Sequence, residues 1–293
     1  MSSKPACRFA AIGVSLPIIN RLLCLIYNTT GCLKSAGDTM NAVVDTITRH
    51  RTYRQFKTNV VLPPDHIQAI ADAARRAPSW MNGQHYSIVR ITNTALRQKI
   101  VAVQPGNPQI GQCSEFWVFV ADAHRAKLCS DAYQGSFAAV GTPDTLLTLS
   151  VDTAMAAQNA IIAAESLGYA TCPVGGLRLV AGQLIEWLGL PEYTFPLFGL
   201  CIGVPDVDMR IKPRLPEKAV IFENHYPSDG ELNHDLQEYE STMTAFGEKR
   251  ERLPFRQKFA HYYSKTYAPK NIALLKQQGF LTHPNGLPED QAS

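Results

Sequence analysis

The sequence predicts one α+β domain that begins near residue 40. From residue 41 onward, segments with helical periodicity alternate with short apolar segments of the kind that form strands. The chain has 293 residues, of which 45% are hydrophobic and 18% charged, so it can bury a substantial core. Residues 229–270 are charged, rich in aromatics and helical in pattern, and we interpret them as an excursion from the same domain.

The first half of the domain contains three expected helices and two expected strands. Prolines mark several boundaries, because proline is tolerated at the start of a helix and interrupts its interior. The run EFWVFVAD is apolar throughout, which is typical of a strand buried on both faces. The expected helices are 41–50, 65–77 and 95–103, and the expected strands are 85–92 and 115–122.

The expected helix at 151–168 is the most informative element. Asp152 suits a first helical turn and Gly168 suits a C-terminal stop. Six alanines are spread around all sides of the segment, so it lacks a polar face and must be buried on several sides. A central position or a second subunit would provide this cover. A strand (169–174), a helix (180–188) and a strand (195–205) follow.

Residues 1–39 do not share these patterns. They are apolar, but Pro17 and Arg21 interrupt them, so they fit neither a spanning helix nor a signal peptide well. We expect a poorly ordered extension, with a membrane-associated leader as the alternative. The expected organisation is an extension (1–39), a domain (40–282) and a tail (283–293).

Bulk charge and cysteine spacing exclude several classes of function. The net charge is only +3, which does not indicate a nucleic-acid partner. The seven cysteines show neither C-x-x-C nor zinc-type spacing, which indicates reduced thiols in the cytoplasm and no metal site. We expect no membrane association.

Two basic clusters are candidate anion sites. The stretch RHRTYRQF, residues 49–56, follows the first helix, and KPRLP, residues 212–216, has a stiff backbone that presents Lys212 and Arg214 side by side. Arginine donates paired hydrogen bonds to phosphate. The alternatives are a helix C-terminus that attracts basic residues and a solvated loop with incidental charges.

Weaker signals lie between the two clusters. APSWMNGQ, residues 77–84, gathers Ser79, Asn82 and Gln84 before a strand. The segment PVGGLR, residues 173–178, has two glycines that would let the backbone approach a planar ligand closely. Neither a dinucleotide fingerprint nor a Walker loop is present in the sequence.

Taken in order, these segments resemble the flavin-dependent nitroreductases. The motifs are H-R-T-Y-R-Q-F, V-D-T-A-M-A-A-Q-N-A, G-G-L-R and K-P-R-L-P, and the resemblance covers about residues 41–280. It is strongest to the oxygen-insensitive NADPH nitroreductase and flavin reductase group. The resemblance implies a nitroreductase-like fold, in which helices flank a central mixed, mostly antiparallel sheet, and a homodimer with FMN at the subunit boundary.

The resemblance also implies the cofactor contacts. The basic clusters would hold the FMN phosphate, the glycines would approach the ring, and Asn107 or Gln109 would supply an amide to it. Arg250 and Arg256 would bind the NADPH phosphate. The expected FMN-binding residues are His50, Arg51, Thr52, Arg54, Ser79, Asn107, Gln109, Pro173, Val174, Gly175, Gly176, Arg178, Lys212 and Arg214.

The expected activity is transfer of two electrons from NADPH through flavin N5 to nitroaromatics, quinones or free flavin, by a ping-pong mechanism. FMN carries the chemistry, so no catalytic side chain is required. The alternative is a non-catalytic flavin store or sensor. Departures from the family occur at the bulky Trp80 and Met81, and at Ala268, where relatives tend to have a basic residue.

Overall fold

The computed structural model describes residues 41–247, 252–283 and 285–286. The expected extension 1–39 lies outside these residues, as does most of the expected tail. Residues from Ala42 onward form one compact unit, which is built around a four-stranded sheet with the order β1-β2-β4-β3. The strands are β1 (Tyr86–Arg90), β2 (Glu115–Asp122), β3 (Ala170–Val174) and β4 (Thr194–Gly203).

All neighbouring strands of this sheet are antiparallel, which confirms the mostly antiparallel sheet. The parallel component is an isolated bridge between Thr52 and Thr171 at the free edge of β3. The segment before the second helix therefore extends the sheet without forming a full strand.

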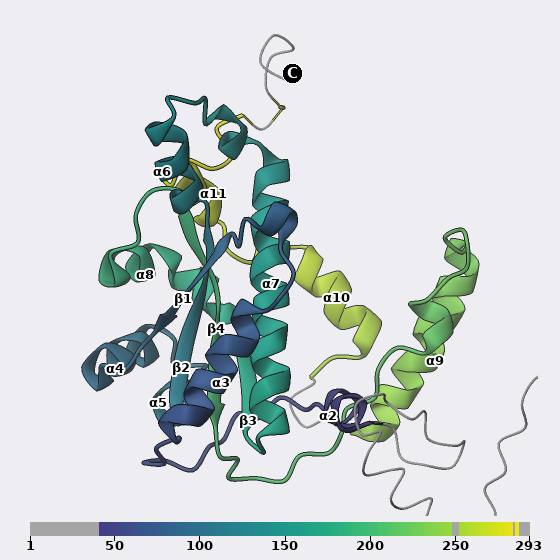
Figure 1. The fold of residues 1–293 in the computed structure, drawn as a ribbon. Helices are drawn as coiled ribbons and strands as arrows, with labels where there is room; N and C mark the ends of the chain where they lie inside the picture. The colour runs from purple at the N-terminus through teal and green to yellow at the C-terminus, as the bar shows by residue number, and fades with distance from the viewer. Residues whose placement is uncertain (1–40, 248–251, 284, 287–293) are drawn as a thin grey trace, which may run out of the picture. The chain divides into compact units, whose positions relative to one another are not determined.

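Two helical layers cover the two faces of the sheet (Figure 1). Alternate residues of β2 point to opposite faces, as its pleat requires. Phe116, Val118 and Val120 pack with α4 (Thr94–Val103), α5 (Gln109–Gln112) and α8 (Ala181–Leu188). Trp117 and Phe119 pack with α3 (Pro64–Arg75) and α7 (Pro143–Ser166) on the other face.

Local sequence signals fix several helix ends. Asn93 accepts a hydrogen bond from the Leu96 amide (3.0 Å) and caps α4. Ser228 and Glu231 form a capping box at the start of α9 (Asp229–Phe246), and Gly247 ends that helix with φ of 65°. The remaining helices are α2 (Ala42–Thr48), α6 (His124–Ala132), α10 (Phe255–Tyr263) and α11 (Asn271–Gln277).

The sequence placed the start of α7 too late. The helix begins at Pro143, so Asp152 lies well inside it and not in its first turn. The C-terminal stop at Gly168 is confirmed, with φ of 85°. By length and composition alone, α7 could cross a membrane, but its buried face packs against α3 and the sheet.

Four 3₁₀ turns complete the described part of the chain. The one that matters for the site is η3 (Gly175–Val180), which leads directly from β3 to α8. Another, η1 (Trp80–Asn82), precedes β1. The other two are η2 (Ala138–Gly141) and η4 (Glu217–Ala219).

Candidate functional site

The basic segment at residues 50–54 lies along the free edge of β3. The Tyr53 amide donates a hydrogen bond to the Thr171 carbonyl (3.0 Å), next to the bridge between Thr52 and Thr171. This pairing holds the segment extended and close to the start of β3. The first predicted phosphate-binding cluster is therefore part of the sheet edge.

His50 is held by a carboxylate. Its Nδ1 lies 2.8 Å from Oε1 of Glu165, near the end of α7, and Thr171 Oγ1 donates to the same oxygen at 2.6 Å. Both His50 and Glu165 are half-buried. Only the Nε2 side of the imidazole is left to face a ligand, so Glu165 fixes the orientation of the His50 ring.

Arg51 carries an unsatisfied buried donor. Its Nη1 donates to the Arg49 carbonyl at 2.9 Å, but its Nε is buried without a hydrogen-bond partner. A buried N–H without a partner costs free energy, and an anion would remove that cost. Arg51 also lines a cavity of about 290 Å³ with Arg49, Tyr53 and Glu165.

The two glycines after β3 face different surroundings. A side chain at Gly176 would meet the amides of Asn107 and Gln104 at 3.0 Å, whereas a side chain at Gly175 would meet no atom within 4 Å. The space over Gly175 is therefore open, and a planar group can approach the backbone there.

A ladder of amide side chains lies behind Gly176. Gln109 donates to Asn107 at 3.1 Å, and Asn107 donates to Gln104 at 3.2 Å. Gln109 is only 2% exposed. Asn107 is half-buried, so burial favours Asn107 over Gln109 as the amide that reaches a ligand.

The chain that leads to the second basic cluster leaves the sheet beside the first. The Lys57 amide donates to the Val204 carbonyl (2.9 Å) and the Asp206 amide donates to the Gln55 carbonyl (3.1 Å), so the chain leaves β4 along residues 55–57. Tyr239 of α9 then donates to the Pro213 carbonyl at 2.9 Å. This contact ties the segment of Lys212 and Arg214 to the C-terminal excursion.

Ser79 does not join these residues within the chain. It precedes β1, at the opposite edge of the sheet from β3. Three interstrand spacings separate the two edges, or about 14 Å. The Ser79 hydroxyl accepts a hydrogen bond from the Gln84 amide at 3.1 Å, which closes the loop on itself.

The loop at residues 79–85 has a strained backbone. Met81, Asn82 and Gln84 all have positive φ, at 49°, 56° and 51°, which is uncommon outside glycine. Trp80 and Met81 are 59% and 80% exposed. The departures from the family at these two positions therefore project from the protein and do not fill its core.

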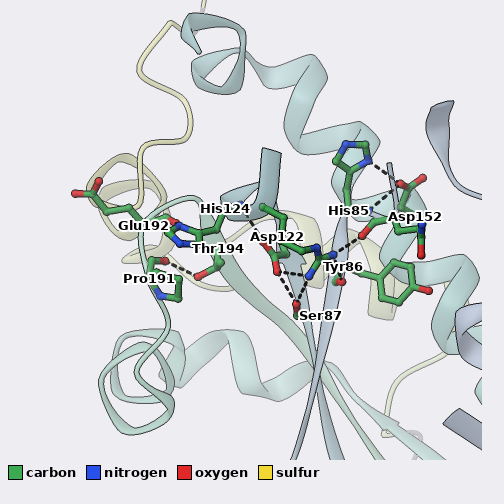
Figure 2. A network of polar contacts seen from close by, with 11 residues as sticks. His85, Tyr86, Ser87, Asp122, His124, Asp152, Pro191, Glu192 and Thr194 are labelled. Atoms are coloured by element: carbon green, nitrogen blue, oxygen red, sulfur yellow. Dashed lines mark hydrogen bonds and ion pairs between the residues drawn. The ribbon is translucent and has the colours of Figure 1, made fainter. Parts of the chain in front are cut away.

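Two charged residues hold this loop, and the sequence did not reveal this role for either of them. Asp152 is 1% exposed and accepts hydrogen bonds from the Trp80 amide (3.0 Å) and His85 Nδ1 (2.9 Å). Arg125 donates to the carbonyls of Gln84 and Tyr86 at 2.5 and 2.7 Å. Figure 2 shows His85 facing Asp152 beside the contacts of Ser87 with Asp122. An acid in the middle of an alanine-rich helix that lacks a polar face was the signal that could have identified Asp152.

Three buried thiols, Cys113, Cys172 and Cys201, belong to one core cluster, and Gln109 of the amide ladder contacts Cys172. Burial, and then a hydrogen bond with Cys113, raise the pKa of the Cys201 thiol well above its usual value, so this group remains neutral. Cys113, Cys129 and Cys201 are free thiols, and the described residues contain no group of side chains suited to a metal ion.

The predicted NADPH residues lie in the excursion. Arg250 lies outside the described residues. Arg256 donates to Glu240 through Nη2 at 3.1 Å, and its backbone amide donates to the other carboxylate oxygen at 2.8 Å. These hydrogen bonds lower the pKa of Glu240. The guanidinium of Arg256 is therefore engaged by a carboxylate in this structure.

Comparisons with known proteins give a consistent result. The model of the nitroreductase family matches residues 47–204, and that of the nitroreductase family C-terminal domain matches residues 212–283. An FMN reductase [NAD(P)H] of Bacillus subtilis (strain 168) is 35% identical over 82% of this chain and 98% of its own length. An oxygen-insensitive NADPH nitroreductase of Salmonella typhimurium (strain LT2) is 36% identical over 83% of this chain and 100% of its own length. The solved structure of the hypothetical oxidoreductase YcnD from Bacillus subtilis superposes with a TM-score of 0.79 and 34% identity, covering 82% of this chain and 98% of that one.

Proposed function

The chain belongs to the nitroreductase family, and from this premise we infer that it is an FMN-dependent oxidoreductase driven by NADPH. The relatives named as an FMN reductase and an NADPH nitroreductase cover nearly their whole length here, which supports the same activity, cofactor and donor for this chain. Its acceptors are small molecules. We propose nitroaromatics, quinones and free flavin as their classes.

The observation that carries the proposal is the buried, unpartnered Nε of Arg51, at the edge of a strand that leads to the open face of Gly175. An anion beside Arg51 and a planar group over Gly175 together match a flavin with a phosphate tail. The residues present therefore fit FMN. We propose that His50, Arg51, Thr52, Arg54, Lys212 and Arg214 hold its phosphate and ribityl chain, and that the ring contacts Asn107 or Gln109, Gly175, Gly176, Arg178 and the end of β3 at Pro173 and Val174.

The chemistry that FMN supplies when bound is acceptance of a hydride at N5 and donation of two electrons. The protein contributes position and charge. Arg178, which is exposed beside the open face of Gly175, would favour negative charge on the reduced ring. Glu165 fixes the orientation of His50, and the Asn107 ladder fixes the amide that hydrogen-bonds to the ring.

We also propose that the enzyme is a homodimer in which Ser79 contacts the FMN of the partner subunit. The separation of Ser79 from the β3 edge supports this arrangement, because one chain does not bring the two groups together. An exposed apolar stripe on α7, with Leu147 at 66% and Val151 at 55% exposure, supports it as well. The free thiols of Cys113, Cys129 and Cys201 fit the cytoplasm as its compartment.

We propose that Arg250 and Arg256 bind the NADPH phosphate, which requires a change in the contacts of Arg256. Arg256 pairs with Glu240 here, so it could bind the phosphate only by sharing or leaving that carboxylate. Ala268, which stands where relatives tend to have a basic residue, removes a further cation. We therefore propose a preference for NADPH that is weaker than in relatives.

Spectra of the purified protein test the function. Purified protein should be yellow, should lose its colour on anaerobic addition of NADPH alone, and should regain it when a quinone is added. Bleaching without any acceptor present is also what the ping-pong order requires. Yellow protein that NADPH fails to bleach would instead support the alternative, a flavin store or sensor.

A further inference from the structure

Three tyrosines lie together on the surface, two in the last turn of α10 and one just after it. We call Tyr262, Tyr263 and Tyr267 the tyrosine cluster. The rings of Tyr262 and Tyr267 lie 5.7 Å apart with an interplanar angle of 36°, and Tyr263 meets Tyr262 edge-on at 5.1 Å. The side chains are 41%, 79% and 40% exposed in chain order, so aromatic surface is presented to solvent here.

The tyrosine cluster adjoins the open glycine face through Arg178. The Arg178 guanidinium carbon lies 5.7 Å from the centre of the Tyr267 ring. Gly175 and Arg178 are three residues apart in the 3₁₀ turn η3, where residues at this spacing lie on the same side. Tyr267 is therefore next to the side of η3 on which the space over Gly175 is open.

We propose that Tyr267, supported by Tyr262, is the surface on which a planar aromatic acceptor stacks, and that Arg178 pairs with an anionic substituent of that acceptor. This inference rests on the proposed function and specifies its acceptor class as planar aromatic carboxylates. The faces of tyrosine rings are electron-rich and those of nitroarenes and quinones are electron-poor, which favours stacked contact. A guanidinium binds a carboxylate through paired hydrogen bonds.

A purely structural reading of the same contacts is that Tyr267 anchors the loop after α10 to η3. That reading predicts that loss of the ring lowers thermal stability without changing acceptor affinity. The stacking proposal predicts that affinity depends on the presence of an aromatic ring and not on the phenol hydroxyl. The two readings can therefore be separated by substituting Tyr267 with leucine and with phenylalanine.

The test is equilibrium binding of 4-nitrobenzoate and of nitrobenzene to the FMN-saturated protein without NADPH. Tyr267→Leu should weaken the binding of both compounds by roughly two- to tenfold, the range expected for one aromatic contact. Tyr267→Phe should bind them like the wild type. Tyr133→Leu is the matched control, because Tyr133 is 89% exposed and lies after α6, away from η3 in the sequence. Arg178→Gln should remove the preference for the carboxylate compound over nitrobenzene.

Turnover gives a second measurement. Tyr267→Leu should lower kcat/KM for 4-nitrobenzoate and leave that for ferricyanide, which has no ring to stack, unchanged. Unchanged binding in Tyr267→Leu, or equal losses for ferricyanide and nitrobenzoate, would overturn the proposal. A third outcome separates the two proposals. If NADPH fails to bleach the wild-type protein but Tyr267→Leu still weakens nitrobenzoate binding, the proposed function is refuted and the stacking contact is not.

Discussion

At the scale of single residues, the candidate site is marked by two basic side chains, one with an unsatisfied hydrogen-bond donor and one held by a carboxylate. Arg51 has a buried Nε without a partner, whereas His50 is committed to Glu165 on one side. The sequence could identify both residues, because they stand in a dense basic motif. It could not identify Glu165 or Gln104, because their roles depend on contacts with residues distant in sequence.

Replacement of Arg51 tests the phosphate site directly. Arg51→Ala removes a charge-assisted hydrogen bond, typically worth about 1.5–3 kcal/mol, so FMN should bind roughly ten- to 150-fold more weakly. The measurement is quenching of flavin fluorescence on titration of the apoprotein. Lys57→Ala is the control, because Lys57 is exposed and lies just beyond the basic segment. Equal FMN affinity in the two variants would show that Arg51 does not hold the phosphate.

At the scale of elements, the strands were easier to predict than the helix ends. The buried strand 115–122 matches β2 residue for residue, because a continuous apolar run between polar residues has few other interpretations. The start of α7 was missed because PDTLLTLS is less apolar than the alanine-rich segment after it. Pro143 at the first helical position was the available signal. Helix α6, whose sequence HRAKLCSDA has little amphipathic character, was not predicted.

The misplaced helix start hid the structural role of Asp152. In a first turn, an aspartate would contribute through the helix dipole, by less than about 1 kcal/mol. Inside α7, its buried carboxylate instead accepts from the Trp80 amide, the His85 amide and the His85 ring. Asp152 thus connects α7 to the strained loop that carries Ser79.

Asp152→Asn should therefore destabilise the protein. The amide nitrogen of asparagine cannot accept a hydrogen bond, so at least one buried donor loses its partner, at a cost of about 1–3 kcal/mol. Urea unfolding followed by circular dichroism measures the change. Asp144→Asn is the control, because Asp144 is an exposed acid in the first turn of the same helix and should cost less than about 1 kcal/mol. Equal losses in both variants would mean that the loop is anchored by other contacts.

At the scale of the whole molecule, the proposed site residues lie at two edges of one sheet. The β3 edge carries Arg51 and leads to Gly175, and the loop before β1 carries Ser79. Between them, α7 presents Leu147, Val151 and Ala154 to solvent, although a helix with this composition should be covered. Sequence patterns predicted the need for cover. They could not show which face of α7 the domain itself leaves open, because that depends on where α3 and the sheet pack.

The final prediction concerns this open face. Val151→Glu places a charge in the middle of the stripe and, if a second subunit covers it, should shift the protein from dimer to monomer and reduce bound FMN. Burial of an unpaired carboxylate at an interface costs several kcal/mol, which at micromolar protein is enough to separate most dimers. Leu128→Glu is a matched control, since Leu128 is 56% exposed and Val151 is 55% exposed, but Leu128 lies on α6. Sedimentation equilibrium gives the mass of each variant, and the ratio of flavin to protein absorbance gives its FMN content. The proposed division of the site between two subunits predicts that both quantities fall together in Val151→Glu and that neither falls in Leu128→Glu. A wild-type monomer that retains FMN would instead show that one chain holds the cofactor without the Ser79 loop of a partner.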